Sequence, residues 1–172
     1  MNTDDVRALL FDVFGTCVDW RTGIIHAVGL VARRKRVAVD AAAFADGWRA
    51  KYQPSMEVVR SGKRSWTILD VLHRESLDGL LPEFGLEELD EAERADLARA
   101  WHRLDPWPDT VEGLLRLKAR YIISPLSNGN VALLVNMAKR AGIPWDLILS
   151  AETSRAYKPL PAAYLNAAAL LG

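Results

Sequence analysis

The chain has 172 residues, enough for one domain with an inserted subdomain. Half of the residues are hydrophobic and the formal net charge is zero, so composition favours a globular domain without a nucleic-acid or membrane partner. The single cysteine, Cys17, excludes an internal disulfide and suits a reducing compartment. The first residues lack a basic region followed by an apolar core, so no signal peptide is expected and a cytoplasmic location is predicted.

Strands and helices are expected to alternate at both ends of the chain. Short apolar runs bounded by turn residues predict buried parallel strands over 6–12, 121–126 and 147–150. Patterns of helical spacing follow these runs over 22–36, 130–141 and 161–171. Because parallel strands need crossover connections, this order predicts one parallel sheet with helices packed on it.

The middle of the chain has a helical pattern. Asp40 is expected to cap a long amphipathic helix, and further helices are predicted over 65–72 and 90–104. The Asp-Pro-Trp-Pro run at 105–108 ends this region, because each proline pushes the preceding residue out of helical geometry. The fold class predicted is therefore α/β, a parallel-sheet core interrupted by a helical insertion.

Polar residues stand where the first two predicted strands end. Asp12 ends the first strand, and Ser127 and Asn128 end the second. The carboxyl ends of parallel strands meet at one edge of the sheet, which is where open α/β sheets bind ligands. The sequence therefore predicts a site at this edge, although Ser-Asn-Gly alone would also suit a plain turn.

Several short segments lie in the order and at the spacing of a known family. Phe-Asp-Val-Phe-Gly-Thr, containing Asp12, resembles a nucleophile motif, and Leu-Ser-Asn-Gly at 126–129 resembles a second motif. Tyr-Lys-Pro, containing Lys158, resembles a third, and Tyr164 and the Trp-Arg-Ala-Lys segment at 48–51 also match. The chain thus resembles the haloacid dehalogenase superfamily, and within it the type II (S)-2-haloacid dehalogenases.

The resemblance implies a chemical role for each core motif. Asp12 would be the nucleophile, since a carboxylate can displace a halide at carbon and form an ester. Lys158 would keep that carboxylate ionised, and Thr16 would hydrogen-bond it from the same turn. Ser127 and Asn128 would donate hydrogen bonds to the substrate carboxylate.

The resemblance also assigns residues to the substrate pocket. Arg49 would stabilise the departing halide or hold a carboxylate, although an exposed helix arginine is the alternative. Tyr164 would bond the substrate or Lys158, unless it is a core residue of its helix. Trp48 suits either a pocket wall or the interior of the insertion.

Phe14 separates two reaction classes. Phosphatases of the superfamily typically have an acid at this position, two residues after the nucleophile, to protonate the alkoxide leaving group. Halide is a weak base and needs no proton, and Phe14 adds apolar surface suited to a haloalkanoate. The expected function is hydrolytic dehalogenation of short 2-haloalkanoic acids to 2-hydroxy acids, with no cofactor and no metal. A phosphatase-type hydrolase and a catalytically inactive homologue are the alternatives.

The resemblance further implies a Rossmann-like core of 1–18 and 107–172, a helical cap of 19–106 and a possible homodimer. Members of the family continue with a fourth strand and an acid-containing motif. By this resemblance the core is expected to lack its C-terminal strands, with the last residue at Gly172. The activity of the shortened chain is left open.

Overall fold

The structure is a computed structural model that describes residues 5–172. Its three strands form one sheet in the order β1-β2-β3, and both pairings are parallel: β1 Ala8–Phe11, β2 Ile122–Ser127 and β3 Leu149–Ser150. Strands β1 and β3 are shorter than the apolar runs that predicted them, whereas β2 keeps the predicted length and is shifted by one residue. The predicted parallel α/β sheet is confirmed.

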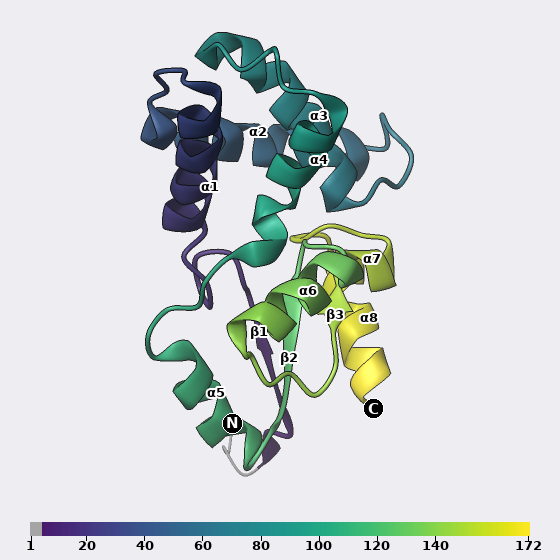
Figure 1. Cartoon of the computed structure of the whole chain (residues 1–172). Coiled ribbons are helices and arrows are strands. Elements are labelled where there is room, and N and C mark those ends of the chain that lie inside the picture. The colour runs from purple at the N-terminus through teal and green to yellow at the C-terminus, as the bar shows by residue number, and fades with distance from the viewer. Residues whose placement is uncertain (1–4) are drawn as a thin grey trace.

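The helices of the middle region gather at one end of the molecule, away from the strands (Figure 1). They are α1 Trp20–Lys35, α2 Ala41–Arg60, α3 Leu69–Leu80 and α4 Glu91–Ala98, with the short 3₁₀-helices η2 Leu81–Phe84 and η3 Arg99–Arg103. The predicted cap at Asp40 is confirmed, because its carboxylate accepts the Ala42 and Ala43 amides at 3.1 and 2.9 Å.

Two predicted helix boundaries in this region are wrong. The helix expected from residue 65 begins at Leu69, because the Thr67 hydroxyl donates to the Ser65 carbonyl and Ile68 is extended with ψ 157°. The single helix expected over 90–104 is α4 followed by η3, since its last turns tighten to 3₁₀ geometry.

The remaining helices pack around the sheet (Figure 1). They are α5 Thr110–Lys118, α6 Val131–Ala141, α7 Ala151–Ser154 and α8 Pro161–Leu171. Helix α7 was not predicted; the Ser150 hydroxyl caps it by accepting the Glu152 amide at 3.0 Å. Gly142 ends α6 as predicted, at φ +69°, in the left-handed region that glycine tolerates.

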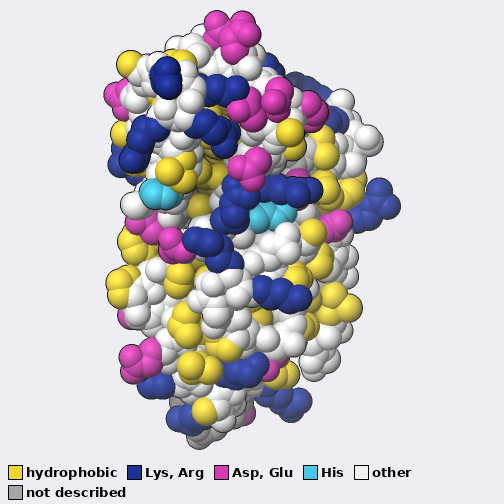
Figure 2. Space-filling view, in the orientation of Figure 1, with side chains coloured by type: hydrophobic (Ala, Val, Ile, Leu, Met, Phe, Trp, Pro, Cys, Tyr) yellow, Lys and Arg dark blue, Asp and Glu magenta, His cyan; other side chains and the backbone are white. Residues whose placement is uncertain are grey.

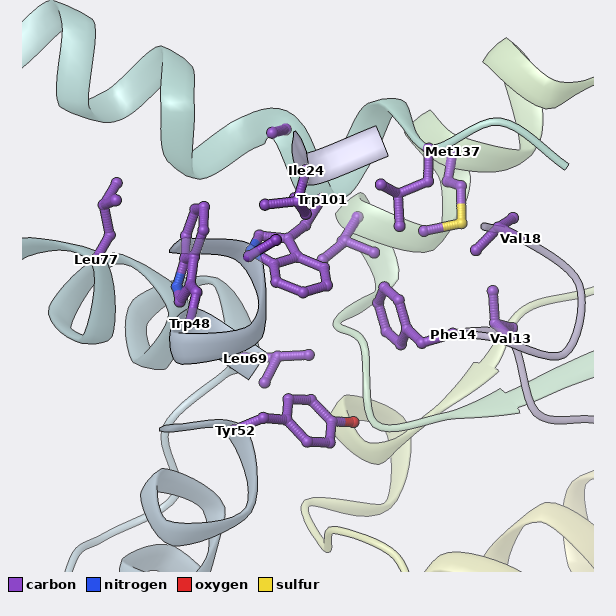
Figure 3. Close-up of a cluster of buried hydrophobic side chains, with 14 of the residues drawn as sticks. Val13, Phe14, Val18, Ile24, Trp48, Tyr52, Leu69, Leu77, Trp101 and Met137 are labelled. Carbon is purple, nitrogen blue, oxygen red and sulfur yellow. The ribbon is translucent and has the colours of Figure 1, made fainter. Parts of the chain in front are cut away.

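One hydrophobic core runs from the sheet into the helical insertion. Phe14, in the turn after β1, packs edge-on against Trp101 with ring centroids 5.9 Å apart. Trp101 in turn meets Trp48 of α2 at 5.4 Å, and Figure 3 shows the three rings in a row. This continuous packing holds the helical insertion against the strand ends. None of the helices in residues 5–172 combines the length and apolar character that a bilayer span requires.

Candidate active site

The site is built on the residue that follows β1. The Asp12 carboxylate receives the Lys158 ammonium at 2.8 Å on one oxygen and the Thr16 hydroxyl at 3.3 Å on the other. The Lys158 side chain is 19% exposed, whereas that of Asp12 is 47% exposed. The carboxylate is therefore held by a cation and a hydroxyl, yet it stays open to an incoming molecule.

Backbone contacts fix where Lys158 lies. Its amide donates to the Asn128 side-chain oxygen at 2.7 Å, and its carbonyl accepts the Arg60 guanidinium at 3.0 Å. Asn128 follows β2 and Arg60 is the last residue of α2. Both the sheet and the helical insertion therefore hydrogen-bond to the backbone of this loop. The hydrogen bond to the Asn128 oxygen thus fixes the position of the Lys158 backbone.

Ser127 and Cys17 are buried residues next to the site in the sequence. The buried Ser127 hydroxyl accepts the Gly129 amide at 3.2 Å and so closes the turn after β2. The Cys17 thiol donates to the Asp12 carbonyl at 3.3 Å. Burial, followed by the neighbouring Asp12 charge, raises the pKa of Cys17 to about 11, so this thiol stays protonated at neutral pH.

Arg49 reaches the site from α2. Its guanidinium lies over the Tyr52 ring at 4.1 Å and over the Trp20 ring at 5.2 Å. Its Nη1 atom is buried and has no hydrogen-bond partner within residues 5–172. Because an unpaired buried donor on a cation is costly, this atom is suited to receive an anion.

Tyr52 belongs to the site although the sequence did not single it out. Burial raises its pKa, while the neighbouring side chains of Asn128 and Arg49 act to lower it. Figure 3 shows its hydroxyl pointing from α2 toward the strand side of the molecule. The signal was available, since Tyr52 lies three residues after Arg49 and therefore on the same face of the helix.

The other predicted pocket residues make no hydrogen bond to Asp12 or Lys158 in residues 5–172. Trp48 is 1% exposed inside the helical insertion, where its indole N–H donates to the His73 carbonyl at 3.1 Å. Phe14 is buried against Trp101. Tyr164 on α8 is 46% exposed, with no side-chain hydrogen bond recorded among the described residues. Contact of these three with a substrate stays a prediction.

In the described part of the chain, no three His, Cys, Asp or Glu side chains come together in a geometry that could hold a metal ion. The polar atoms around Asp12 belong instead to Lys158 and Thr16.

Comparison with known proteins decides the family. A family model described as haloacid dehalogenase-like hydrolase matches residues 6–172. The chain belongs to this family. The expected resemblance and the fold class are thereby confirmed.

Curated relatives and solved structures agree with this assignment. The (S)-2-haloacid dehalogenase 4A of Burkholderia cepacia is 30% identical over 98% of this chain and 71% of its own length. The (S)-2-haloacid dehalogenase of Xanthobacter autotrophicus is 30% identical over 97% of this chain and 63% of its own length.

Among solved structures, the defluorinating L-2-haloacid dehalogenase Rha0230 is 58% identical with a TM-score of 0.95, over 97% of this chain and 69% of that one. The L-2-haloacid dehalogenase of Xanthobacter autotrophicus with chloropropionic acid covalently bound is 28% identical with a TM-score of 0.82. The match covers 97% of this chain and 65% of that one. The chain thus spans about two thirds of the length of these relatives.

Proposed function

We propose that the chain hydrolyses short 2-haloalkanoic acids to 2-hydroxy acids through an ester on Asp12. The observation that carries this proposal is the accessible Asp12 carboxylate, held at 2.8 Å from Lys158 at the carboxyl end of β1. The names of the relatives and the covalently bound chloropropionic acid in one of them support the same chemistry.

In the first step an Asp12 carboxylate oxygen attacks C2 of the substrate. The new C–O bond forms as the carbon–halogen bond breaks, and the halide leaves with the bonding electron pair. Arg49 Nη1, which has no partner within residues 5–172, is the group proposed to receive the negative charge that develops on the halogen. Ser127 and Asn128 are proposed to hold the substrate carboxylate, with Phe14 as apolar wall.

In the second step water attacks the ester carbonyl of Asp12. The acyl C–O bond breaks, the 2-hydroxy acid leaves, and the carboxylate is restored with release of one proton. Lys158 stabilises the carboxylate in its ionised form before and after the cycle. Thr16 orients the second carboxylate oxygen.

The cellular and domain setting is also proposed. Residues 19–106 would form a cap over a core of 1–18 and 107–172, as the separate grouping of the helices supports (Figure 1). A cytoplasmic location is supported by the single, buried Cys17. A homodimer rests on the family resemblance alone, and analytical ultracentrifugation tests it.

The direct test is halide release from (S)-2-chloropropionate by the purified chain. We expect Asp12→Asn to release no chloride above background, because an amide oxygen is a poor nucleophile. Asp46→Asn is the matched control, since Asp46 makes an exposed ion pair with Arg21. Fluoroacetate is the second substrate, because the relative that is 58% identical is described as defluorinating. Chloride release that survives Asp12→Asn would overturn the proposal.

A further inference from the structure

A polar contact joins α3 of the helical insertion to α6 beside the sheet. The Asp70 amide donates to the Asn130 side-chain oxygen at 3.2 Å, and the Asn130 side-chain nitrogen donates to Asp70 Oδ2 at 2.9 Å. Asn130 is 3% exposed and stands two residues after Asn128, which holds Lys158. The two residues are 60 positions apart in the sequence, so the contact bridges the two ends of the molecule.

A second pair of hydrogen bonds extends this contact. His102 Nε2 lies 3.0 Å from Asp70 Oδ1, and the Asn136 side-chain nitrogen lies 3.0 Å from His102 Nδ1. With the Asn136 amide donating to Nδ1, the ring proton sits on Nε2 and is donated to Asp70. Burial by itself would raise the pKa of Asp70, yet the bonds from His102 and Asn130 lower it below its ordinary value. Each oxygen of Asp70 thus has its own donor.

This network lies between the helices of the insertion, which carry Arg49, and the loop after β2, which contains Asn128. On one side, α3 packs against α2, which carries Arg49 and Tyr52. On the other side, Asn130 occupies the N-cap position of α6, at the end of the loop that follows Ser127 and contains Asn128, and its side chain bonds to Asp70 rather than to the helix. A shift of Asp70 relative to Asn130 would therefore change the distance between Arg49 and the nucleophile.

We propose that Asp70, His102, Asn130 and Asn136 form a latch that positions Arg49 of the helical insertion over the Asp12–Lys158 pair. They are positioning residues and touch no reacting atom. This inference rests on the proposed function for its kinetic consequence. A buried polar network in which every donor and acceptor is paired favours one relative placement of the two elements, because any shift would leave a buried polar group unpaired.

The experiment exchanges the two central residues. Asp70→Asn leaves one side-chain oxygen for two donors, and Asn130→Asp sets two carboxylates against each other. The double variant Asp70→Asn/Asn130→Asp restores every bond, because the amide and the carboxylate trade places and His102 still donates to an oxygen at position 70. Asp78→Asn is the matched control, since Asp78 lies on the same helix and pairs with Arg74 and Arg94 of the insertion.

We expect each single variant to lower kcat for chloride release about tenfold with a smaller change in KM, because Arg49 acts on charge that develops in the transition state. The double variant should recover to within about twofold of wild type, which is the signature of a coupled pair. Thermal melts are recorded for every variant, and kinetics are measured well below each Tm. Wild-type kcat in Asp70→Asn, or a double variant no better than the single ones, would overturn the latch.

Hydrogen exchange separates this inference from the proposed function. If the wild-type chain releases no halide, the proposed function fails, and the latch is judged by exchange in residues 127–131. The single variants should then exchange faster in that segment, and the double variant should return to the wild-type rate. Unchanged exchange in the single variants would overturn the latch.

Discussion

At the scale of single residues, the site depends on one ion pair. Lys158 lies 2.8 Å from Asp12 and is the less exposed of the two side chains. Its place is set by the backbone contacts of its own loop to Asn128 and Arg60 rather than by its side chain. The ammonium is therefore fixed before any substrate arrives, as catalysis by a preorganised charge requires.

Replacing Lys158 by methionine tests that charge. Methionine keeps the length and the apolar stem, so the loop contacts made by the backbone should persist. We expect chloride release to fall by about 10²-fold or more, the usual effect of removing one preorganised charged or donor group. Lys51→Met on the exposed face of α2 is the control and should keep wild-type activity. Equal activity in the two variants would show that Asp12 does not need this cation.

The sequence could identify only some of these residues. Asp12, Thr16 and Lys158 belong to short motifs that can be found in the sequence by their order and spacing. In the structure, Thr16 and Lys158 both contact Asp12. Asp70 and Asn130 carry no such signal. A hydrogen bond between residues 60 positions apart depends on how two helices pack, and no local pattern encodes that.

At the scale of elements, α2 is the helix that carries Arg49 toward the site. Its start depends on Asp40, whose carboxylate accepts two otherwise unpaired amides of the first turn. Its buried face holds Phe44, Trp48 and Met56. The cap residue and the spacing of the apolar residues therefore both predict the same helix. The helix was predictable for this reason.

Removing the cap should destabilise the whole chain. We expect Asp40→Ala to lower the free energy of unfolding by about 1 kcal/mol, the typical cost of losing an N-cap side chain. Urea unfolding followed by circular dichroism measures it. Glu88→Ala, at an exposed carboxylate that makes no side-chain hydrogen bond or ion pair within residues 5–172, should change the midpoint very little. A midpoint in Asp40→Ala equal to that of Glu88→Ala would contradict the role of the cap.

Helices for which the cap residue and the apolar pattern indicate different starting points were predicted less well. Ser65 has the side chain of a cap, yet the helix begins four residues later at Leu69 without a side-chain cap. Packing of Leu69, Leu72 and Leu77 decides where that helix lies. Tertiary burial therefore overrode the local signal.

At the scale of the whole molecule, charge is balanced and the largely aliphatic core contains a group of aromatic rings. The formal net charge of the chain is zero, and the face in Figure 2 carries both acidic and basic side chains, with Lys and Arg the more frequent. The helical insertion buries His73, whose ring stacks on Trp101 with centroids 4.4 Å apart. Neither ring nitrogen of His73 has a hydrogen-bond partner in the described residues.

This buried histidine predicts how stability depends on pH. Burial is the main cause that lowers the pKa of His73 from 6.5 to about 3. Between these two values the unfolded chain binds a proton that the folded chain excludes, so His73 makes stability fall as the pH drops below 6.5. The loss attributable to His73 should approach about 1.4 kcal/mol for each pH unit.

His73→Leu should remove this part of the pH dependence. Urea unfolding at pH 7 and pH 5 would show a smaller difference in His73→Leu than in wild type, whatever the absolute stability of the variant. His26→Leu, at an exposed position of α1, should keep the wild-type difference. The same difference in wild type and His73→Leu would mean that His73 accepts its proton in the folded state.

The central claim is that Asp12 becomes covalently attached to the substrate. The most direct measurement is the intact mass of the chain, quenched in acid at several times after mixing with (S)-2-chloropropionate, followed by peptide mapping. We predict a gain of one carboxyethyl group on the peptide that contains Asp12, and no gain in Asp12→Asn. Chloride released with no adduct at any quench time, or an adduct that persists in Asp12→Asn, would contradict the account.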